Sequence, residues 1–200
     1  MFTGIVQDQV RILTKEITKQ GVSFTLSRPK QEGALKEGES VLLNGICSTV
    51  VRLTKDTFGV DYMPETRKLT TVDVWKSEDL VHFEPSLRIG DTLGGHFVFG
   101  HVDTVEKIVS LETFVDDVYG QSVELVVSLS QEGKNFLVPK GSIALDGVSL
   151  TVTKVSNQSF CVSLIPHTLE RTHLGSFQKG DPINIEYDML ARYVLAQKAQ

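Results

Sequence analysis

Cys47 is the first residue of this chain whose type and surroundings could support nucleophilic chemistry. It follows the polar turn Asn44-Gly45 and lies two residues before Thr49, which a strand would place on the same face. A cysteine within a strand is more often a small buried apolar residue, and it acts as a nucleophile only where its surroundings favour the thiolate. Cys161 has no polar frame, and we interpret it as structural. Cys47 is therefore a candidate nucleophile, with the buried alternative left open.

Two histidines, His96 and His101, lie in one glycine-rich segment, residues 94–101. On an extended segment this spacing places them on opposite faces, so we expect no metal-binding pair and no metal site. The glycines allow the backbone to approach a flat ligand closely, which favours a functional role for His101. A structural role, satisfying backbone groups, is the alternative for either histidine. We interpret His82 and His173 as surface residues.

The chain contains an internal repeat. A shift of 102 positions aligns residues 40–72 with residues 142–174, with many identical residues, and it sets Cys47 opposite Ser149. Such self-similarity indicates a duplicated structural unit. We therefore expect two similar pockets that differ at the position of Cys47 and Ser149.

The closing segments of the two copies align differently. The pair Gly90-Asp91 matches Gly180-Asp181 only at a shift of 90, so we expect the second copy to be shorter there. The start of the first copy, residues 2–6, corresponds to residues 98–102, which places the seam near residue 97.

Apolar and polar residues alternate in both copies, as in residues 22–27 and 122–129, which is typical of half-buried strands. About six strands in each copy, without long helical patterns between them, favour small antiparallel barrels that close their own edges. The predicted fold is all-β, with two tandem six-stranded antiparallel Greek-key barrels related by the repeat and a C-terminal helix. The expected domains are an N-terminal barrel (1–97), a C-terminal barrel (98–186) and a helical tail (187–200).

The tail has no counterpart in the first copy. Leu190, Tyr193, Val194 and Gln197 fall on one helical face. The helix could cover an open barrel end or pack on its equivalents in other subunits, and the pattern favours the oligomer.

Two proline-containing segments, Met63–Thr66 and Ile165–Thr168, each follow a predicted strand. Proline ends strand pairing, which would leave threonine hydroxyls and backbone amides free to hold a polar heterocycle. Plain turns and duplicated ligand loops both fit this pattern.

Composition excludes several classes of protein. Net charge is −5, with 20 basic and 25 acidic residues and no basic cluster, so we expect no nucleic-acid partner. No apolar run is long enough for a membrane span and the start lacks a signal-peptide pattern, so we expect a soluble, cytoplasmic protein. The two cysteines have no metal-ligand spacing and cannot form a disulfide scaffold.

Several ordered motifs resemble the riboflavin synthase family, alpha chain. They lie at residues 1–6, 44–50, 90–102, 146–152 and 164–172, so the resemblance covers the whole chain, including the duplication and the tail. It implies a transferase in which one 6,7-dimethyl-8-ribityllumazine gives a four-carbon unit to another, yielding riboflavin and 5-amino-6-ribitylaminouracil. It also implies a homotrimer, joined by the tail helix, with two substrate molecules in each active site between subunits. No cofactor is implied.

The resemblance assigns roles to particular residues. Ser40, Cys47 and His101 would activate one lumazine in the N-terminal pocket, where Phe2 and Thr3 would flank the ring. Ser149 would be the catalytic residue of the C-terminal pocket, and the adding nucleophile stays open between the Cys47 thiol, a hydroxyl and water. The implied substrate-binding residues are Phe2, Thr3, Gly4, Ile5, Val6, Ser48, Thr49, Asp61, Tyr62, Met63, Pro64, Glu65, Thr66, Gly100, Val102, Lys140, Asp146, Leu150, Thr151, Ile165, Pro166, His167, Thr168, Leu169, Glu170 and Asp188.

Four positions depart from the family pattern: Ser48, Arg67, Phe99 and His167. Phe99 and His167 bear on pocket polarity and on contacts to the ribityl chain. The main alternative is a non-catalytic lumazine- or flavin-binding antenna protein, against which the combination of Ser40, Cys47 and His101 argues. A flavin reductase would need a nucleotide-binding domain for which two barrels leave no room.

Overall fold

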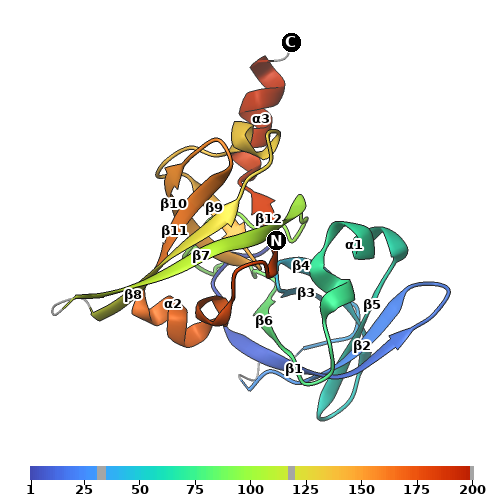
Figure 1. The fold of residues 1–200 in the computed structure, drawn as a ribbon. Helices are drawn as coiled ribbons and strands as arrows, with labels where there is room; N and C mark the ends of the chain where they lie inside the picture. Colours follow the sequence, from blue (N-terminus) through green and yellow to red (C-terminus); the bar gives the residue numbers. More distant parts are fainter. Residues whose placement is uncertain (31–34, 117–119, 199–200) are drawn as a thin grey trace.

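The computed structural model describes residues 1–30, 35–116 and 120–198, which form two closed barrels and a terminal helix (Figure 1). The strands of the N-terminal barrel are β1 (Asp8–Ile17), β2 (Val22–Ser27), β3 (Ser40–Leu43), β4 (Ile46–Leu53), β5 (Thr57–Tyr62) and β6 (Leu80–Pro85). The helix α1 (Pro64–Leu69) and the 3-10 helix η1 (Thr71–Val74) connect β5 to β6.

The C-terminal barrel repeats this order. Its strands are β7 (Thr104–Asp116), β8 (Gly120–Ser128), β9 (Ser142–Leu145), β10 (Val148–Val155), β11 (Ser159–Leu164) and β12 (Pro182–Tyr187). Its helical segments are η2 (Gly133–Phe136), α2 (Pro166–Arg171) and η3 (Leu174–Ser176), and the terminal helix is α3 (Met189–Lys198). No helix in the described part of the chain is long and apolar enough to cross a membrane.

Alternation along the strands closes each barrel around its own core. In β2, Val22, Phe24 and Leu26 are buried while the intervening residues are partly exposed. The strand order is β1-β2-β5-β4-β3-β6 in one barrel and β7-β8-β11-β10-β9-β12 in the other, all antiparallel. In the first barrel β6 returns to lie beside β3 after the β3-β4-β5 meander, which is a Greek key. The predicted tandem barrels are confirmed.

The repeat continues to the last strand at an unchanged shift. β6 and β12 are 102 positions apart, and so are the turns before them, where Glu78 donates to Ile12 O and Gly180 to Ile108 O, both at 2.8 Å. Both residues have positive φ, +75° at Glu78 and +95° at Gly180, although that conformation favours glycine. The expected shortening of the second copy is therefore wrong. The error arose because the first copy has Glu78, not glycine, at the position of Gly180. The sequence alignment therefore paired Gly180 with Gly90 instead.

Two arms, residues 1–7 and residues 96–102, cross between the barrels. They pair through Phe2 and Val98, whose N–H groups each donate to the other's carbonyl at 2.7 and 3.1 Å. Both side chains are fully buried against Leu42 and Ala144, one from each barrel. The arms thus form an apolar seam between the barrels.

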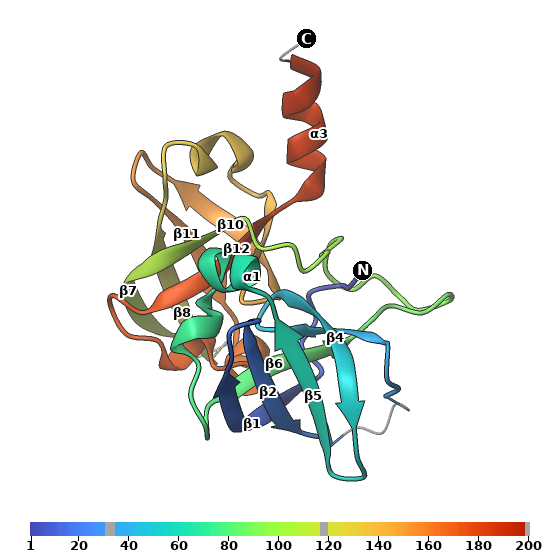
Figure 2. The ribbon, with the colours of Figure 1, turned by 90° about the vertical axis from the view of Figure 1, so that its right-hand side faces the viewer.

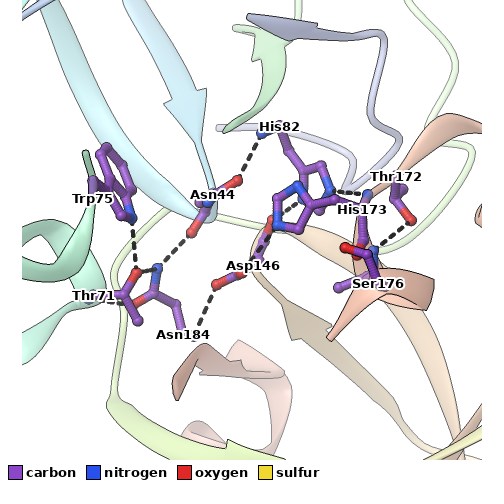
Figure 3. Close-up of polar contacts among 10 residues, drawn as sticks. Asn44, Thr71, Trp75, His82, Asp146, Thr172, His173, Ser176 and Asn184 are labelled. Carbon is purple, nitrogen blue, oxygen red and sulfur yellow. Dashed lines mark hydrogen bonds and ion pairs between the residues drawn. The ribbon is translucent and has the colours of Figure 1, made fainter. Parts of the chain in front are cut away.

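A polar junction network joins residues of the two barrels (Figure 3). We give that name to three pairs related by the repeat: Asn44 with Asp146, His82 with Asn184, and Thr71 with His173. On one side, the amide of Asn184 donates from Nδ2 to Asn44 O at 2.8 Å and accepts at Oδ1 from Thr71 N–H at 2.8 Å.

On the other side of the network an imidazole takes the place of the amide. His82 accepts at Nε2 from His173 N–H at 3.0 Å, and its Nδ1 lies 2.9 Å from Asp146 O. Because Nε2 accepts, Nδ1 carries the proton and the ring is neutral. The rings of His82 and His173 stack with centroids 3.8 Å apart. The assignment of His82 to the surface is wrong, since it is 2% exposed and the second barrel covers the outer face of β6. His173, on the second barrel, is partly exposed, with 20% of its side chain accessible.

Candidate active site

We call the outer surface of the N-terminal barrel around Cys47 the first pocket. Cys47 and Thr49 point outward from β4, while Ser48 points into the barrel. Ser40 on β3 pairs with Thr49 and shares its face, and Asp61 is exposed on the neighbouring strand β5. The structure therefore places these four expected residues, Ser40, Cys47, Thr49 and Asp61, on one surface.

Asp61 is held as an anion on that surface. Arg52 Nη2 lies 2.9 Å from its Oδ1, and the Ser23 hydroxyl donates to the same oxygen at 2.7 Å. The hydrogen bond from Arg52 lowers the pKa of Asp61, against a smaller opposing effect of burial. The pocket thus carries an exposed ion pair between β4 and β5.

The second pocket is the repeat of the first on the C-terminal barrel. Ser149 and Thr151 point outward from β10, with Leu150 directed into the core. Lys140 N–H donates to Val152 O at 2.7 Å, which places this exposed lysine beside β10. Asp188 follows β12 and precedes α3.

Each arm brings its backbone to the candidate catalytic residue, Ser149 or Cys47, of the opposite barrel. Ser149 N–H donates to Gly4 O at 2.8 Å, and Cys47 N–H donates to Gly100 O at 2.9 Å. Both glycines have a φ of +76°, and a Cβ on either would lie within 2.8 Å of the facing residue's Cβ, which only glycine avoids. His101 follows Gly100 and is exposed beside this contact.

Two buried glutamates clamp the arms. Glu84 accepts from the N–H groups of Thr3 and Gly4 at 2.7 and 3.0 Å, and Glu186 accepts from those of Phe99 and Gly100 at 2.7 and 2.8 Å. Burial raises the pKa of both carboxyl groups, while these amides oppose the change. Sequence reasoning missed this pair, although the two positions are 102 residues apart.

The arms correct one expected placement. Thr3 and Gly4 lie against Ser149 of the C-terminal barrel, and the Phe2 side chain is fully buried in the seam. The expectation that Phe2 and Thr3 flank a ring in the N-terminal pocket is therefore wrong. Ile5 and Val6 continue along the same arm, Ile5 being exposed.

Other expected binding residues have side chains directed away from the outer faces. Ser48 and Tyr62 meet inside the first barrel with hydroxyl oxygens 2.6 Å apart, and Leu150 lies in the second core. Burial raises the pKa of Tyr62 beyond the ordinary range. Asp146 is 3% exposed within the junction network, where burial raises its pKa. The side chains of these four residues are therefore turned away from the outer faces, because the strands direct them inward or the other barrel covers them, and substrate binding by these residues stays a prediction.

The two proline segments begin short helices. Pro64 opens α1 and Pro166 opens α2, because proline has a helical φ and needs no N–H partner in the first turn. The segments are therefore not plain turns, and their role as duplicated ligand-binding segments stays a prediction. The exposed or partly exposed residues of these segments still follow β5 and β11: Met63, Pro64, Glu65, Thr66, Ile165, Pro166, His167, Thr168, Leu169 and Glu170. Val102, at the end of the second arm, is partly buried against the first core.

His96 belongs to the second pocket, which sequence reasoning missed. Its Nδ1 lies 2.6 Å from Ser149 Oγ, and it is 8% exposed. The glycine pair before it was the available signal, because a Cβ on Gly95 would lie 2.6 Å from Ser149 Cβ. A separate cavity of about 530 Å³ lies between the first arm and residues 83–94, and neither Cys47 nor Ser149 lines it.

Two solved structures share the fold over most of their length. LumP complexed with riboflavin superposes with a TM-score of 0.83 at 21% identity, covering 94% of this chain and 99% of that one. LumP complexed with 6,7-dimethyl-8-(1'-D-ribityl) lumazine has a TM-score of 0.81 at 22% identity, covering 93% and 98%.

The family is given by closer similarities. A model of the lumazine binding domain matches residues 3–86 and 99–188, once in each barrel. Riboflavin synthase of Brucella abortus (strain 2308) is 38% identical over 198 residues, covering 96% of both proteins. Riboflavin synthase of Bacillus subtilis (strain 168) is 36% identical over 194 residues, covering 97% of this chain and 88% of that protein. With a lumazine-binding domain in each barrel and relatives that match it from end to end, the chain belongs to the riboflavin synthase family.

Proposed function

We propose that this chain is a transferase that converts two molecules of 6,7-dimethyl-8-ribityllumazine into riboflavin and 5-amino-6-ribitylaminouracil. The observation that carries the proposal is the similarity to riboflavin synthases over nearly the whole chain. One substrate gives a four-carbon unit and the other receives it, so the reaction needs no external oxidant or reductant. A reaction between two identical substrates also suits a chain with two related pockets.

The protein's main contribution is to orient two rings. The 7-methyl protons of the lumazine are already acidic because the ring delocalises the anion, so holding two rings in contact supplies much of the rate gain. Ser40, Cys47 and His101 would face one ring on the outer surface of the first barrel. Ser149, with Thr151, would face the other.

The proposed assembly is a homotrimer with active sites between subunits. In this chain Thr49, Asp61 and Thr151 are exposed, so each pocket is an open surface that a ring would only half cover. The N-terminal pocket of one chain facing the C-terminal pocket of another would enclose two rings and exclude water. This supports placing two substrate molecules at each subunit contact.

The test is turnover with a single substrate. Purified protein given only the dimethyl ribityllumazine should form riboflavin and 5-amino-6-ribitylaminouracil in equal amounts, measured by chromatography. Binding of lumazine without turnover would reject the transferase and favour the alternative, a non-catalytic lumazine- or flavin-binding antenna protein. Cys47→Ser is the matched variant, because it keeps the shape of the pocket while replacing the thiol.

A further inference from the structure

His96 gives Ser149 a partner that Cys47 lacks. Nδ1 of His96 lies 2.6 Å from Ser149 Oγ, and its Nε2 is buried without a hydrogen-bond partner among the described residues. Cys47 has the same place in the repeat, but no histidine hydrogen bond to it occurs in the part of the chain that the structure describes. The two pockets therefore differ in the group behind the reactive residue as well as in that residue.

The crossing of the arms creates this difference. His96 N–H donates to Thr3 O at 3.1 Å, which fixes the second arm alongside the first and directly over β10. Gly95 permits the close approach, since a Cβ there would lie 2.7 Å from Ser149 Oγ.

The Cys47 thiol and the Ser149 hydroxyl also differ in their need for an adjacent base. A thiol ionises near pH 8.5, whereas a serine hydroxyl requires an adjacent base before it can move a proton. Burial lowers the pKa of His96, and the negative charge of Asp188 opposes that effect. The imidazole is therefore a neutral base at neutral pH, held at hydrogen-bond distance from the Ser149 hydroxyl.

We propose that His96 is a positioning residue that makes the Ser149 hydroxyl a proton relay in the C-terminal pocket. As a C–H bond of the substrate breaks, its electron pair stays in the ring, its proton passes to Ser149 Oγ, and the hydroxyl proton passes to His96 Nδ1. The proton returns by the same route when a nitrogen of the product is protonated, so no co-reactant is consumed. This inference rests on the proposed reaction and assigns that reaction's proton transfer to one pocket.

A double-mutant cycle tests whether His96 acts through Ser149. His96→Ala should lower kcat about 100-fold, the usual scale of acid–base catalysis, with KM changed less than about threefold. In a Ser149→Ala background the same substitution should lower kcat less than about threefold, because its partner is gone. In a Cys47→Ser background, the matched control in the other pocket, the full loss should persist. Equal losses in all three backgrounds would overturn the inference.

A conservative variant separates proton transfer from folding. His96→Asn places an amide near the position of Nδ1, so it should keep the hydrogen bond and the melting temperature but not restore kcat. Recovery of kcat in His96→Asn would show that only orientation matters, and the relay would be rejected. Because this variant preserves the arm, the result stands even where His96→Ala fails to fold.

An NMR measurement of the hydrogen bond and protonation of His96 is independent of turnover. Nitrogen-15 NMR should show the Nδ1 resonance of His96 shifting in Ser149→Ala, and Asp188→Asn should lower the pKa of His96 and move the acid limb of kcat to lower pH. An Nδ1 resonance unchanged by Ser149→Ala would overturn the inference even in a protein that makes no riboflavin. Riboflavin formation with equal losses in the cycle would reject this inference alone and leave the proposed function standing.

Discussion

Gly95 sets how closely the second arm approaches Ser149. A Cβ at this position would lie 2.2 Å from Thr3 O and 2.6 Å from Ser149 Cβ. Relieving these contacts would require movement of the Thr3 backbone or of strand β10. At the neighbouring Gly94 a Cβ would meet only the Ile5 side chain, at 3.3 Å. Adjacent glycines thus provide a test and its control.

We expect Gly95→Ala to displace His96 from Ser149 and to destabilise the chain by about 1–3 kcal/mol, the usual effect of overpacking. Thermal unfolding and kcat should both fall. Gly94→Ala should change each much less, because the end of a flexible side chain can move away. Equal effects of the two substitutions would show that the close approach of the arm to β10 is not required.

The two glutamates that clamp the arms, Glu84 and Glu186, lie on the strands β6 and β12. Each strand is buried on both faces, because the arms and the other barrel cover what would otherwise be an outer surface. A carboxylate there satisfies two backbone amides of an arm, in addition to the hydrogen bonds that the arm makes with the other arm and with β4 or β10. The position of each strand therefore fixes the position of the arm that its glutamate binds.

Glu186→Gln should loosen the arm that carries Gly100 and His101. Loss of a charge-assisted hydrogen bond to a buried amide costs about 1.5–3 kcal/mol, and the melting temperature should fall by about 2–4 °C for each kcal/mol. Hydrogen exchange should accelerate at the amides of Phe99 and Gly100. Glu65→Gln, at an exposed carboxylate, is the control, and unchanged exchange in Glu186→Gln would contradict the clamp.

The helix α3 extends away from both barrels (Figure 2). Its first turn is tied to the second barrel, since Arg192 pairs with Asp103 and lies over the Phe136 ring. Leu190, Tyr193 and Val194 are 64%, 68% and 52% exposed, an apolar stripe left open in a single chain. Such a helix gains most of its stability from packing against other elements.

We expect the double substitution Leu190→Ser with Tyr193→Ser to dissociate the proposed trimer and abolish most turnover. Light scattering should then report the monomer mass while circular dichroism shows intact barrels. Ala196→Ser, an exposed helix position outside the stripe, is the control. A doubly substituted protein that keeps the trimer mass would show that the helix does not join the subunits.

At the scale of the whole molecule, the junction network places a titratable side chain, His82, on one side of the contact between the barrels. Burial, and secondarily the nearby His173, lower the pKa of His82 well below its usual value, while its bond to the Asp146 carbonyl opposes this. The charged or titratable groups facing it are His173, Asp146 and, two residues along its own strand, Glu84. His82 therefore takes up a proton near pH 6.5 in the unfolded chain but stays neutral at that pH in the folded chain.

Stability from His82 is consequently present above about pH 6.5 and is lost as the pH falls below it, by at most about 1.4 kcal/mol per pH unit. His82→Asn should remove this loss, since an amide can accept from His173 N–H and donate to Asp146 O, as Asn184 does in the other half. Melting temperatures from pH 7.5 to 5.0 should therefore decline less in His82→Asn than in the wild type. The exposed His167→Asn should behave as the wild type, and parallel curves for His82→Asn and the wild type would refute the mechanism.

Local pattern accounts for what could be predicted. Strand alternation identified both barrels, and it set Cys47 and Thr49 on one face because neighbours two apart along a strand share a side. The same rule would have directed Ser48 and Leu150 inward. His82 was misplaced because β6 looks half exposed by pattern, and only the second barrel covers its other face.

The sequence by itself determined the duplicated barrels, the outward row around Cys47 and its copy around Ser149, since these follow from a period of two and a repeat. Only the tertiary structure decided that each arm serves the opposite barrel, that His82 stacks on His173, and that His96 stands behind Ser149. Those contacts join residues far apart in the chain across a seam between two similar units. No local periodicity distinguishes an arm that folds back on its own barrel from one that crosses to the other.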